Sequence, residues 1–140
     1  MNIAVLGSGN GGCAVAFDCA AQGHQVSLFD FQQFPDSIKA VQKNGGIHCE
    51  GELEGFQPLV HAGHEIEKTL DGADIIYAVG PAYSTRPFAE ACRPYLQKGQ
   101  IVIVCPSSCG GAIEFKNGAG LDLRDEGIVV AETLSLIHIS

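Results

Sequence analysis

The sequence predicts an α/β fold in which a doubly wound, mainly parallel sheet carries helices on both of its faces. Short, nearly all-apolar segments recur along the 140 residues, as expected of strands that are buried on both sides. Segments of helical composition separate them, so that strands and helices alternate. A glycine-rich turn lies between the first apolar segment and the first helical one, an order typical of Rossmann-like folds.

The start of the chain fits a single strand–helix–strand unit. Residues 2–6 are apolar and end at a glycine, which predicts a buried strand. Residues 7–12 form the turn, and the alanine-rich residues 13–22 predict a helix that Gly23 ends. Residues 25–30 predict the second strand. We expect the crossover between these parallel strands to be right-handed.

The rest of the chain continues the alternation without an internal repeat or a low-complexity linker. Pro35 favours the first turn of a helix, and residues 47–53 are expected to form a small hairpin or a bulged pair around Gly51. The further helices are expected over residues 35–43, 65–70 and 85–96. The further strands of the sheet are expected over residues 56–61, 73–79, 100–105 and 127–131.

Charge and composition exclude several classes of protein. The formal net charge of −8 repels nucleic-acid phosphates and anionic lipids, so we expect no nucleic-acid and no membrane partner. The N-terminus lacks the basic region of a signal peptide, and no apolar run reaches the roughly 18 residues that span a bilayer, so we expect a cytoplasmic protein. The six cysteines form no CxxC pair, so we expect reduced thiols and no metal site.

The glycine-rich turn has the spacing GxGxxG of a dinucleotide-binding loop. Gly7 permits a tight turn out of the strand, Gly9 lets the backbone approach a pyrophosphate, and Gly12 lets the helix lie close to the sheet. The free amides at the start of the helix then face the phosphates, and the helix dipole favours the anion. The predicted phosphate-binding segment is Gly7, Ser8, Gly9, Asn10, Gly11 and Gly12.

An acidic residue follows at the distance that a ribose-binding carboxylate requires. Asp30 ends the second predicted strand, 21 positions after Gly9. We expect it to accept hydrogen bonds from the hydroxyls of the adenosine ribose. Its charge would repel a 2′-phosphate, and the next residues offer no lysine or arginine to compensate. The sequence therefore predicts NAD as the cofactor in preference to NADP.

Residues after the fourth and fifth predicted strands complete the expected site, because open α/β sheets bind ligands beyond the carboxyl ends of their strands. The expected cofactor contacts there are Val79, Gly80, Pro81, Ala82 and Pro106. We also expect Ser107 and Ser108 near the nicotinamide or the substrate.

Other polar residues have weaker support. Arg86 could bind a substrate carboxylate but is expected to be a surface residue, and Glu114 follows two glycines and is expected to cap a helix. No histidine is placed at the nicotinamide edge by the sequence, so we assign no catalytic residue.

Several longer motifs resemble the opine dehydrogenase family, which includes the octopine and nopaline dehydrogenases. The opening AVLGSGNGGCAVAFDCAAQGHQVSLFD carries the distinctive Asn10-Gly11-Gly12. The later matches are NGGI, EGF, GADIIYAVGPA, GQIVIVCPSSCGGAIEF and VVAET, in the order of the family. One departure is HAGH at residues 61–64, which replaces a threonine-rich turn and leaves the adenine-side contacts open.

The resemblance implies an enzyme that reductively condenses an amino acid with a 2-oxo acid, passing a hydride from NADH to an imine carbon. It also implies that residues 1–133 are the NAD-binding domain and that a catalytic, helical second domain is absent. We expect residues 134–140 to be a non-native tail. The amino-acid partner and the oligomeric state stay undetermined.

Two alternatives remain open. The first is another dehydrogenase of this architecture, such as a glycerol-3-phosphate dehydrogenase or a ketopantoate reductase, against which Asn10-Gly11 argues. The second is a non-catalytic NAD-sensing module that regulates a partner through a cofactor-driven change of shape.

Overall fold

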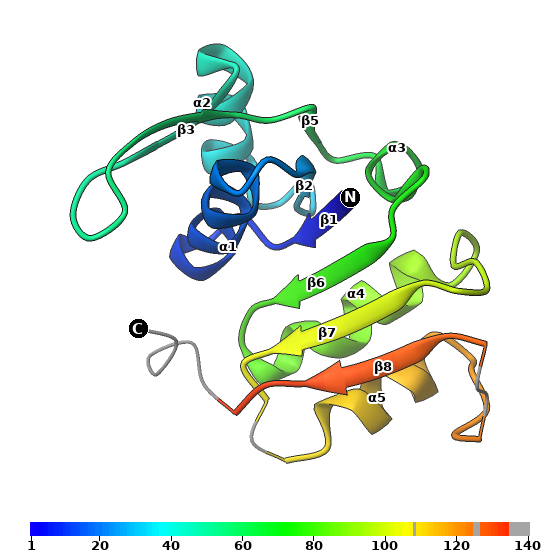
Figure 1. The fold of residues 1–140 in the computed structure, drawn as a ribbon. Coiled ribbons are helices and arrows are strands. Elements are labelled where there is room, and N and C mark those ends of the chain that lie inside the picture. The colour runs from blue at the N-terminus through cyan, green and yellow to red at the C-terminus, as the bar shows by residue number, and fades with distance from the viewer. Residues whose placement is uncertain (108, 125–126, 135–140) are drawn as a thin grey trace.

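A six-stranded, wholly parallel sheet forms the centre of the molecule (Figure 1). This computed structural model describes residues 1–107, 109–124 and 127–134. The strands lie in the order β5-β2-β1-β6-β7-β8. The chain therefore adds β2 and β5 on one side of β1 and then adds β6, β7 and β8 on the other, so the strand order reverses between β1 and β6. Their bounds are β1 Asn2–Leu6, β2 Gln25–Phe29, β5 His61–Gly63, β6 Ile75–Val79, β7 Ile101–Cys105 and β8 Val129–Glu132.

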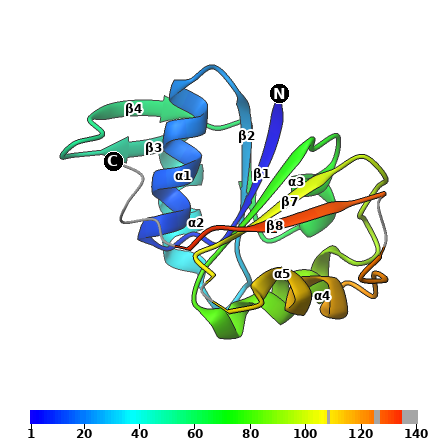
Figure 2. The ribbon, with the colours of Figure 1, turned by 60° about the horizontal axis from the view of Figure 1, so that its bottom comes forward.

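Helices cover both faces of this sheet, which confirms the predicted doubly wound α/β class (Figure 2). One face carries α1 (Asn10–Ala21) and α2 (Pro35–Asn44), and the other carries α3 (Ile66–Leu70), α4 (Thr85–Cys92) and α5 (Gly111–Gly118). Two apolar clusters result, because successive side chains of a strand point to opposite faces. In β1, for example, Val5 packs in the α1–α2 cluster and Leu6 in the α3–α5 cluster.

The third strand of the sheet is not where the sequence predicts it. Residues 56–61 were expected to form it, but most of that segment belongs to β4 (Gly55–Pro58), which pairs antiparallel with β3 (Gly46–Cys49) in a separate hairpin. The third strand is the short β5. The apolar side chain that suggested a buried strand, Phe56, is 42% exposed and contacts the ring of His48 across the hairpin.

The hairpin and two helices also differ in extent from the prediction. The turn between β3 and β4 spans residues 50–54, so the hairpin is longer than the expected 47–53. Helix α4 ends at Cys92 instead of residue 96, because Pro94 has no N–H to donate to the carbonyl one turn earlier. Helix α1 begins at Asn10 instead of residue 13, so the second half of the glycine motif forms its first turn.

The register of β1 with β6 places the glycine-rich turn beside the end of β6. Leu6 pairs with Ala78, and Gly7 and Val79 are the next residues of the two strands at the switch in strand order. Ligands bind at such a switch point in open α/β sheets, so the topology directs attention to this edge. Within the described residues, none of the helices has the length and apolar character required to cross a bilayer.

Candidate functional site

The first and third glycines of the motif are required by close packing of the backbone. A Cβ at Gly7 would lie 2.1 Å from the carbonyl oxygen of Val79, and the φ of this residue is +106°. A Cβ at Gly12 would lie 1.8 Å from the carbonyl oxygen of Gly7. No side chain fits at either position, so these glycines let strand, turn and helix approach one another.

The second glycine of the motif faces open space. A Cβ at Gly9 would meet no atom within 4 Å, and Gly9 is the N-cap residue of α1. The cap residue makes no side-chain hydrogen bond, and no acidic residue stands in the first turn. The amides at the start of a helix have no partner within it, so α1 presents Asn10, Gly11 and Gly12 as donors for an anion.

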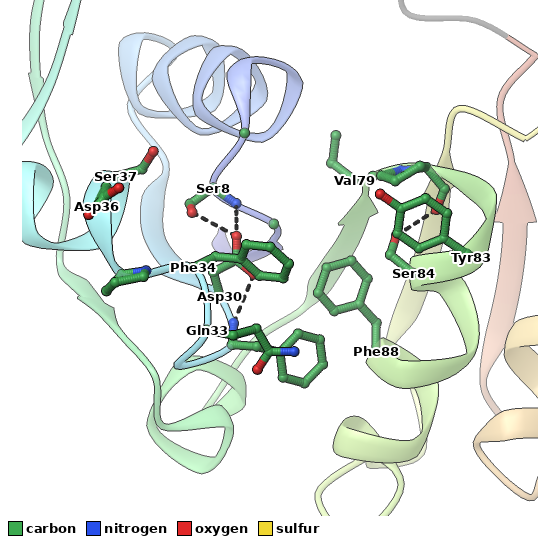
Figure 3. Close-up of a pocket in the computed structure, with 16 residues that line it drawn as sticks. Ser8, Asp30, Gln33, Phe34, Asp36, Ser37, Val79, Tyr83, Ser84 and Phe88 are labelled. Atoms are coloured by element: carbon green, nitrogen blue, oxygen red, sulfur yellow. Dashed lines mark hydrogen bonds between the residues drawn. The ribbon is translucent and has the colours of Figure 1, made fainter.

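The carboxylate of Asp30 holds the turn in place. Its Oδ2 accepts hydrogen bonds from the amide and from the hydroxyl of Ser8, both at 2.7 Å, and its Oδ1 accepts one from the amide of Phe31 at 2.8 Å (Figure 3). Asp30 is 7% exposed. Since a carboxylate offers about four lone-pair directions, Oδ1 keeps capacity for a further donor such as a ligand hydroxyl. The Ser8 hydroxyl can also rotate away and free a second position.

A histidine supports the main chain of Asp30. The Nδ1 of His64 lies 2.7 Å from the carbonyl oxygen of Asp30, and it donates a hydrogen bond there when it carries the proton. This residue lies directly after β5, in the segment that departs from the opine dehydrogenase motif. This contact holds the end of β2 against the end of its neighbour β5.

A cleft of about 420 Å³ opens between the end of β2 and the end of β6 (Figure 3). The stacked rings of Phe31 and Phe88, with centroids 5.4 Å apart, contribute to its apolar part. Neither lysine, arginine nor histidine occurs among its lining residues, whereas two carboxylates do. The lining residues are Gly7, Ser8, Gly9, Asp30, Phe31, Gln33, Phe34, Pro35, Asp36, Ser37, Val79, Gly80, Pro81, Tyr83, Ser84 and Phe88.

A second hollow of about 540 Å³ adjoins this cleft and shares Gly80 and Pro81 with it. It lies beyond the ends of β6 and β7, beside the start of α5. Its remaining lining residues in the described part of the chain are Ala82, Thr85, Pro106, Ser107, Cys109, Gly110, Gly111, Glu114 and Leu134.

A carboxylate from the last strand holds the start of α5. Glu132 accepts hydrogen bonds from the amide of Ala112 at 2.8 Å and from the hydroxyl of Ser107 at 3.2 Å. The hydrogen bond from Ala112, with smaller contributions from Ser107 and the neighbouring amides, lowers the pKa of Glu132. The sequence did not identify this residue, because Glu132 and α5 meet only in the folded chain.

Arg86 and Glu114 pair with each other. The Nε of Arg86 lies 2.6 Å from Oε1 of Glu114, and a second nitrogen lies 3.9 Å from Glu90. Glu114 therefore links α5 to α4 and does not cap a helix, which corrects the prediction. Gly110 is the N-cap residue of α5. The pairing of Arg86 supports its interpretation as a surface residue.

The fold brings most of the predicted site residues to these two adjoining hollows. Gly7, Ser8, Gly9, Asp30, Val79, Gly80 and Pro81 line the first, and Ala82, Pro106 and Ser107 line the second. Asn10, Gly11 and Gly12 lie behind the turn in α1 and line neither. The sequence missed residues 34–37, although their place after β2 puts them at the same edge. Ser108 and residues 135–140 lie outside the described residues.

Apart from Cys109, no described cysteine or histidine side chain lines the two hollows. Burial raises the pKa of Cys13, Cys19, Cys49 and Cys105, and it raises that of Cys92 to about 12, so these thiols are protonated at neutral pH. In the part of the chain that the structure describes, no three cysteine, histidine or acidic side chains lie together as metal ligands would. No described histidine lines either hollow.

Comparison with known families shows the family of this chain. Residues 2–108 match the model of the NAD-dependent glycerol-3-phosphate dehydrogenase N-terminus. The chain belongs to this family. It is therefore a dinucleotide-binding domain, and NAD is its cofactor.

Curated relatives within this superfamily of domains include two kinds of dehydrogenase. The opine dehydrogenase of Arthrobacter sp. (strain 1C) is 34% identical over 96% of this chain and 37% of its own length. A glycerol-3-phosphate dehydrogenase [NAD(P)+] of Lacticaseibacillus casei (strain BL23) is 32% identical over 68% of this chain and 27% of its own length. The first match confirms the resemblance found in the motifs. The chain spans about a third of the length of these relatives.

Solved structures show the same fold at low identity. An octopine dehydrogenase with NADH and pyruvate superposes with a TM-score of 0.77, at 19% identity, over 93% of this chain and 35% of that chain. A ketopantoate reductase from Ralstonia eutropha gives a TM-score of 0.72, at 22% identity, over 94% of this chain and 40% of that chain. These likenesses support the fold and leave the substrate open.

Proposed function

We propose that this chain holds NAD(H) in the cleft between β2 and β6 as the cofactor domain of an opine dehydrogenase-like enzyme. The single observation that carries the binding site is the position of Asp30. Its carboxylate lines the same cleft as the glycine-rich turn, directly beside the uncapped start of α1. An acceptor for ribose hydroxyls and donors for a diphosphate thus stand next to each other.

The described residues fit the successive parts of the dinucleotide. The open face at Gly9 and the first-turn amides of α1 suit the pyrophosphate. The free lone pair of Asp30 suits the adenosine ribose. The second hollow, beyond β6 and β7, suits the nicotinamide half, because it continues from the first through Gly80 and Pro81. We assign cofactor binding on this basis to the residues predicted from the sequence.

Charge supports NAD in preference to NADP. The first hollow is lined by carboxylates and by no cationic side chain, so a 2′-phosphate would find repulsion and no partner. The net charge of the whole chain, −8, adds to this repulsion.

The proposed reaction is the reductive condensation of an amino acid with a 2-oxo acid. When bound, the nicotinamide cofactor supplies the hydride. The residues of this chain bind and orient the cofactor, and we assign no proton transfer to them, since no described histidine lines the hollows. The identity with the Arthrobacter enzyme over nearly the whole chain supports this substrate class.

Glycerol-3-phosphate dehydrogenase activity is the second candidate. The matched family model and several relatives at 28–32% identity carry that activity in their names. A glycerol-3-phosphate dehydrogenase also matches over 96% of the chain, at 29% identity, whereas the opine dehydrogenase is 34% identical over the same share, which favours the first candidate. The test is an assay of NADH oxidation by a protein that contains this domain. Oxidation with dihydroxyacetone phosphate, but not with an amino acid plus a 2-oxo acid, would favour the second candidate.

Asp30→Ala tests the binding site directly. Hydrogen bonds to a charged group contribute about 1.5–3 kcal/mol, so we expect NAD+ affinity in isothermal calorimetry to fall by roughly 10- to 100-fold. Ser8→Ala removes one hydrogen-bond donor to Asp30 and keeps the carboxylate. It therefore shows how much of the lost affinity comes from loosening the turn and how much from losing the acceptor. Asp71→Ala, at an exposed acid before β6 on the opposite edge of the sheet, is the matched control. Unchanged NAD+ affinity in a folded Asp30→Ala variant would remove Asp30 from the site.

A further inference from the structure

We propose that Asp36 is a second determinant of cofactor choice, which excludes nucleotides that carry a 2′-phosphate. This inference rests on the proposed binding of NAD in the same cleft. The sequence argument for NAD used only Asp30 and the residues directly after it, whereas the structure brings in the first turn of α2.

The first turn of α2 forms one wall of the cleft. Pro35, Asp36 and Ser37 line it together with Asp30, which lies at the end of the preceding strand (Figure 3). The Asp36 side chain is exposed, and none of the ion pairs among the described residues involves it. Its charge is therefore available to the contents of the cleft.

Without Asp36, this wall would suit a phosphate. The N-cap residue of α2, Phe34, makes no side-chain hydrogen bond, so the first amides of the helix lack a capping group. The hydroxyl-bearing Ser37 stands beside them in the lining, and the helix dipole favours an anion at this end. The carboxylate of Asp36, in the same turn and the same lining, adds a negative charge that opposes an incoming phosphate.

The geometry of the ribose brings its 2′-position toward this wall. If Asp30 accepts hydrogen bonds from the ribose hydroxyls, a phosphate on the 2′-oxygen must extend past the Asp30 carboxylate. It then enters the space lined by the residues that follow β2. These include Gln33 and Asp36, and the set contains no cation. Lys39, one turn further along α2, is not among the lining residues and does not compensate.

The test compares two small ligands that differ only in the 2′-phosphate, AMP and adenosine 2′,5′-bisphosphate, with NAD+ and NADP+ as the full cofactors. We measure their affinities by calorimetry for the wild type, Asp36→Asn and Asp71→Asn. A charge at a helix N-terminus is worth about two- to fivefold in affinity at low salt. We therefore expect Asp36→Asn to raise the ratio of NADP+ to NAD+ affinity, and the matching ratio for the smaller ligands, by that factor.

The outcomes separate this inference from the proposed function. Wild-type protein that binds neither NAD+ nor AMP would overturn both. Binding of NAD+ with an unchanged affinity ratio in Asp36→Asn would overturn the role of Asp36 alone. An equal rise in Asp71→Asn would also overturn it, because the effect would then come from net charge and not from position. A genuine local effect should shrink as salt is raised.

Discussion

At the scale of single residues, Gly9 and Gly12 stand three positions apart under different constraints. A Cβ at Gly12 would lie 1.8 Å from the carbonyl oxygen of Gly7, so Gly12→Ala must push α1 away from the sheet. We expect the free energy of unfolding to fall by about 3 kcal/mol, at the upper end of overpacking costs. Urea denaturation followed by circular dichroism measures this loss.

The matched control is Gly9→Ala, in the same turn. A Cβ there meets no protein atom within 4 Å, so we expect the stability to change by about 1 kcal/mol or less. The new methyl group would instead occupy the face assigned to the pyrophosphate, and NAD+ affinity should fall. If both variants lost equal stability, the division of roles between the two glycines would be wrong.

Sequence spacing alone predicted that Asp30 and the glycine-rich turn belong to one site, but it did not predict the residues that only the fold brings to the same edge. Asp30 and the glycines follow from the length of one strand–helix–strand unit. Asp36 could not be assigned in the same way, since its contribution depends on the direction in which α2 leaves the loop. His64 reaches the carbonyl oxygen of Asp30 only because β5 pairs with β2.

At the scale of elements, the contact between β8 and α5 depends on the charge of Glu132. The hydrogen bonds from Ala112 and Ser107 lower its pKa below the usual 4.5, so they stabilise the fold while the carboxylate is ionised. This contribution is present above the unfolded-state pKa and is lost as the pH falls through the lowered pKa. We expect Glu132→Gln to lower the melting temperature at pH 7.

The difference in melting temperature between the wild type and Glu132→Gln should also depend on pH. Below pH 4.5 the unfolded chain binds a proton at Glu132 more readily than the folded chain does, so the gap between the two melting temperatures should shrink as the pH falls toward the folded-state pKa. Thermal unfolding at a series of pH values from 7 to about 3 follows it. A gap that stayed constant over this range would show that the carboxylate charge does not hold α5.

The elements that the sequence located well are those with long apolar runs. The strands β1, β2, β6 and β7 lie in the interior of the sheet, and their buried pattern leaves little choice of position. The edge strand β5 has three residues, fewer than a periodic pattern needs. The preceding β4 pairs with β3, and this pairing is decided by the hairpin and not by the segment itself.

At the scale of the whole molecule, the order of the strands creates the site. The reversal between β1 and β6 separates the α1–α2 side from the α4–α5 side, and the two adjoining hollows lie at that edge. Residues that follow β2 and β6 line most of the first hollow. Residues that follow β6 and β7 line most of the second. A ligand in both would thus contact the two halves of the sheet, as an extended dinucleotide does.

This arrangement predicts binding without turnover. The lining of both hollows supplies cofactor contacts, but no described histidine is in place to exchange a proton at the reacting carbon. We expect the 140-residue chain to bind NADH, seen as a change in nicotinamide fluorescence, and to leave it unoxidised with pyruvate and each of several amino acids. Oxidation that requires both substrates would show that the chain contains its own acid–base group. Absence of any fluorescence change would instead count against the cofactor site, so the two measurements test the two parts of the assignment separately.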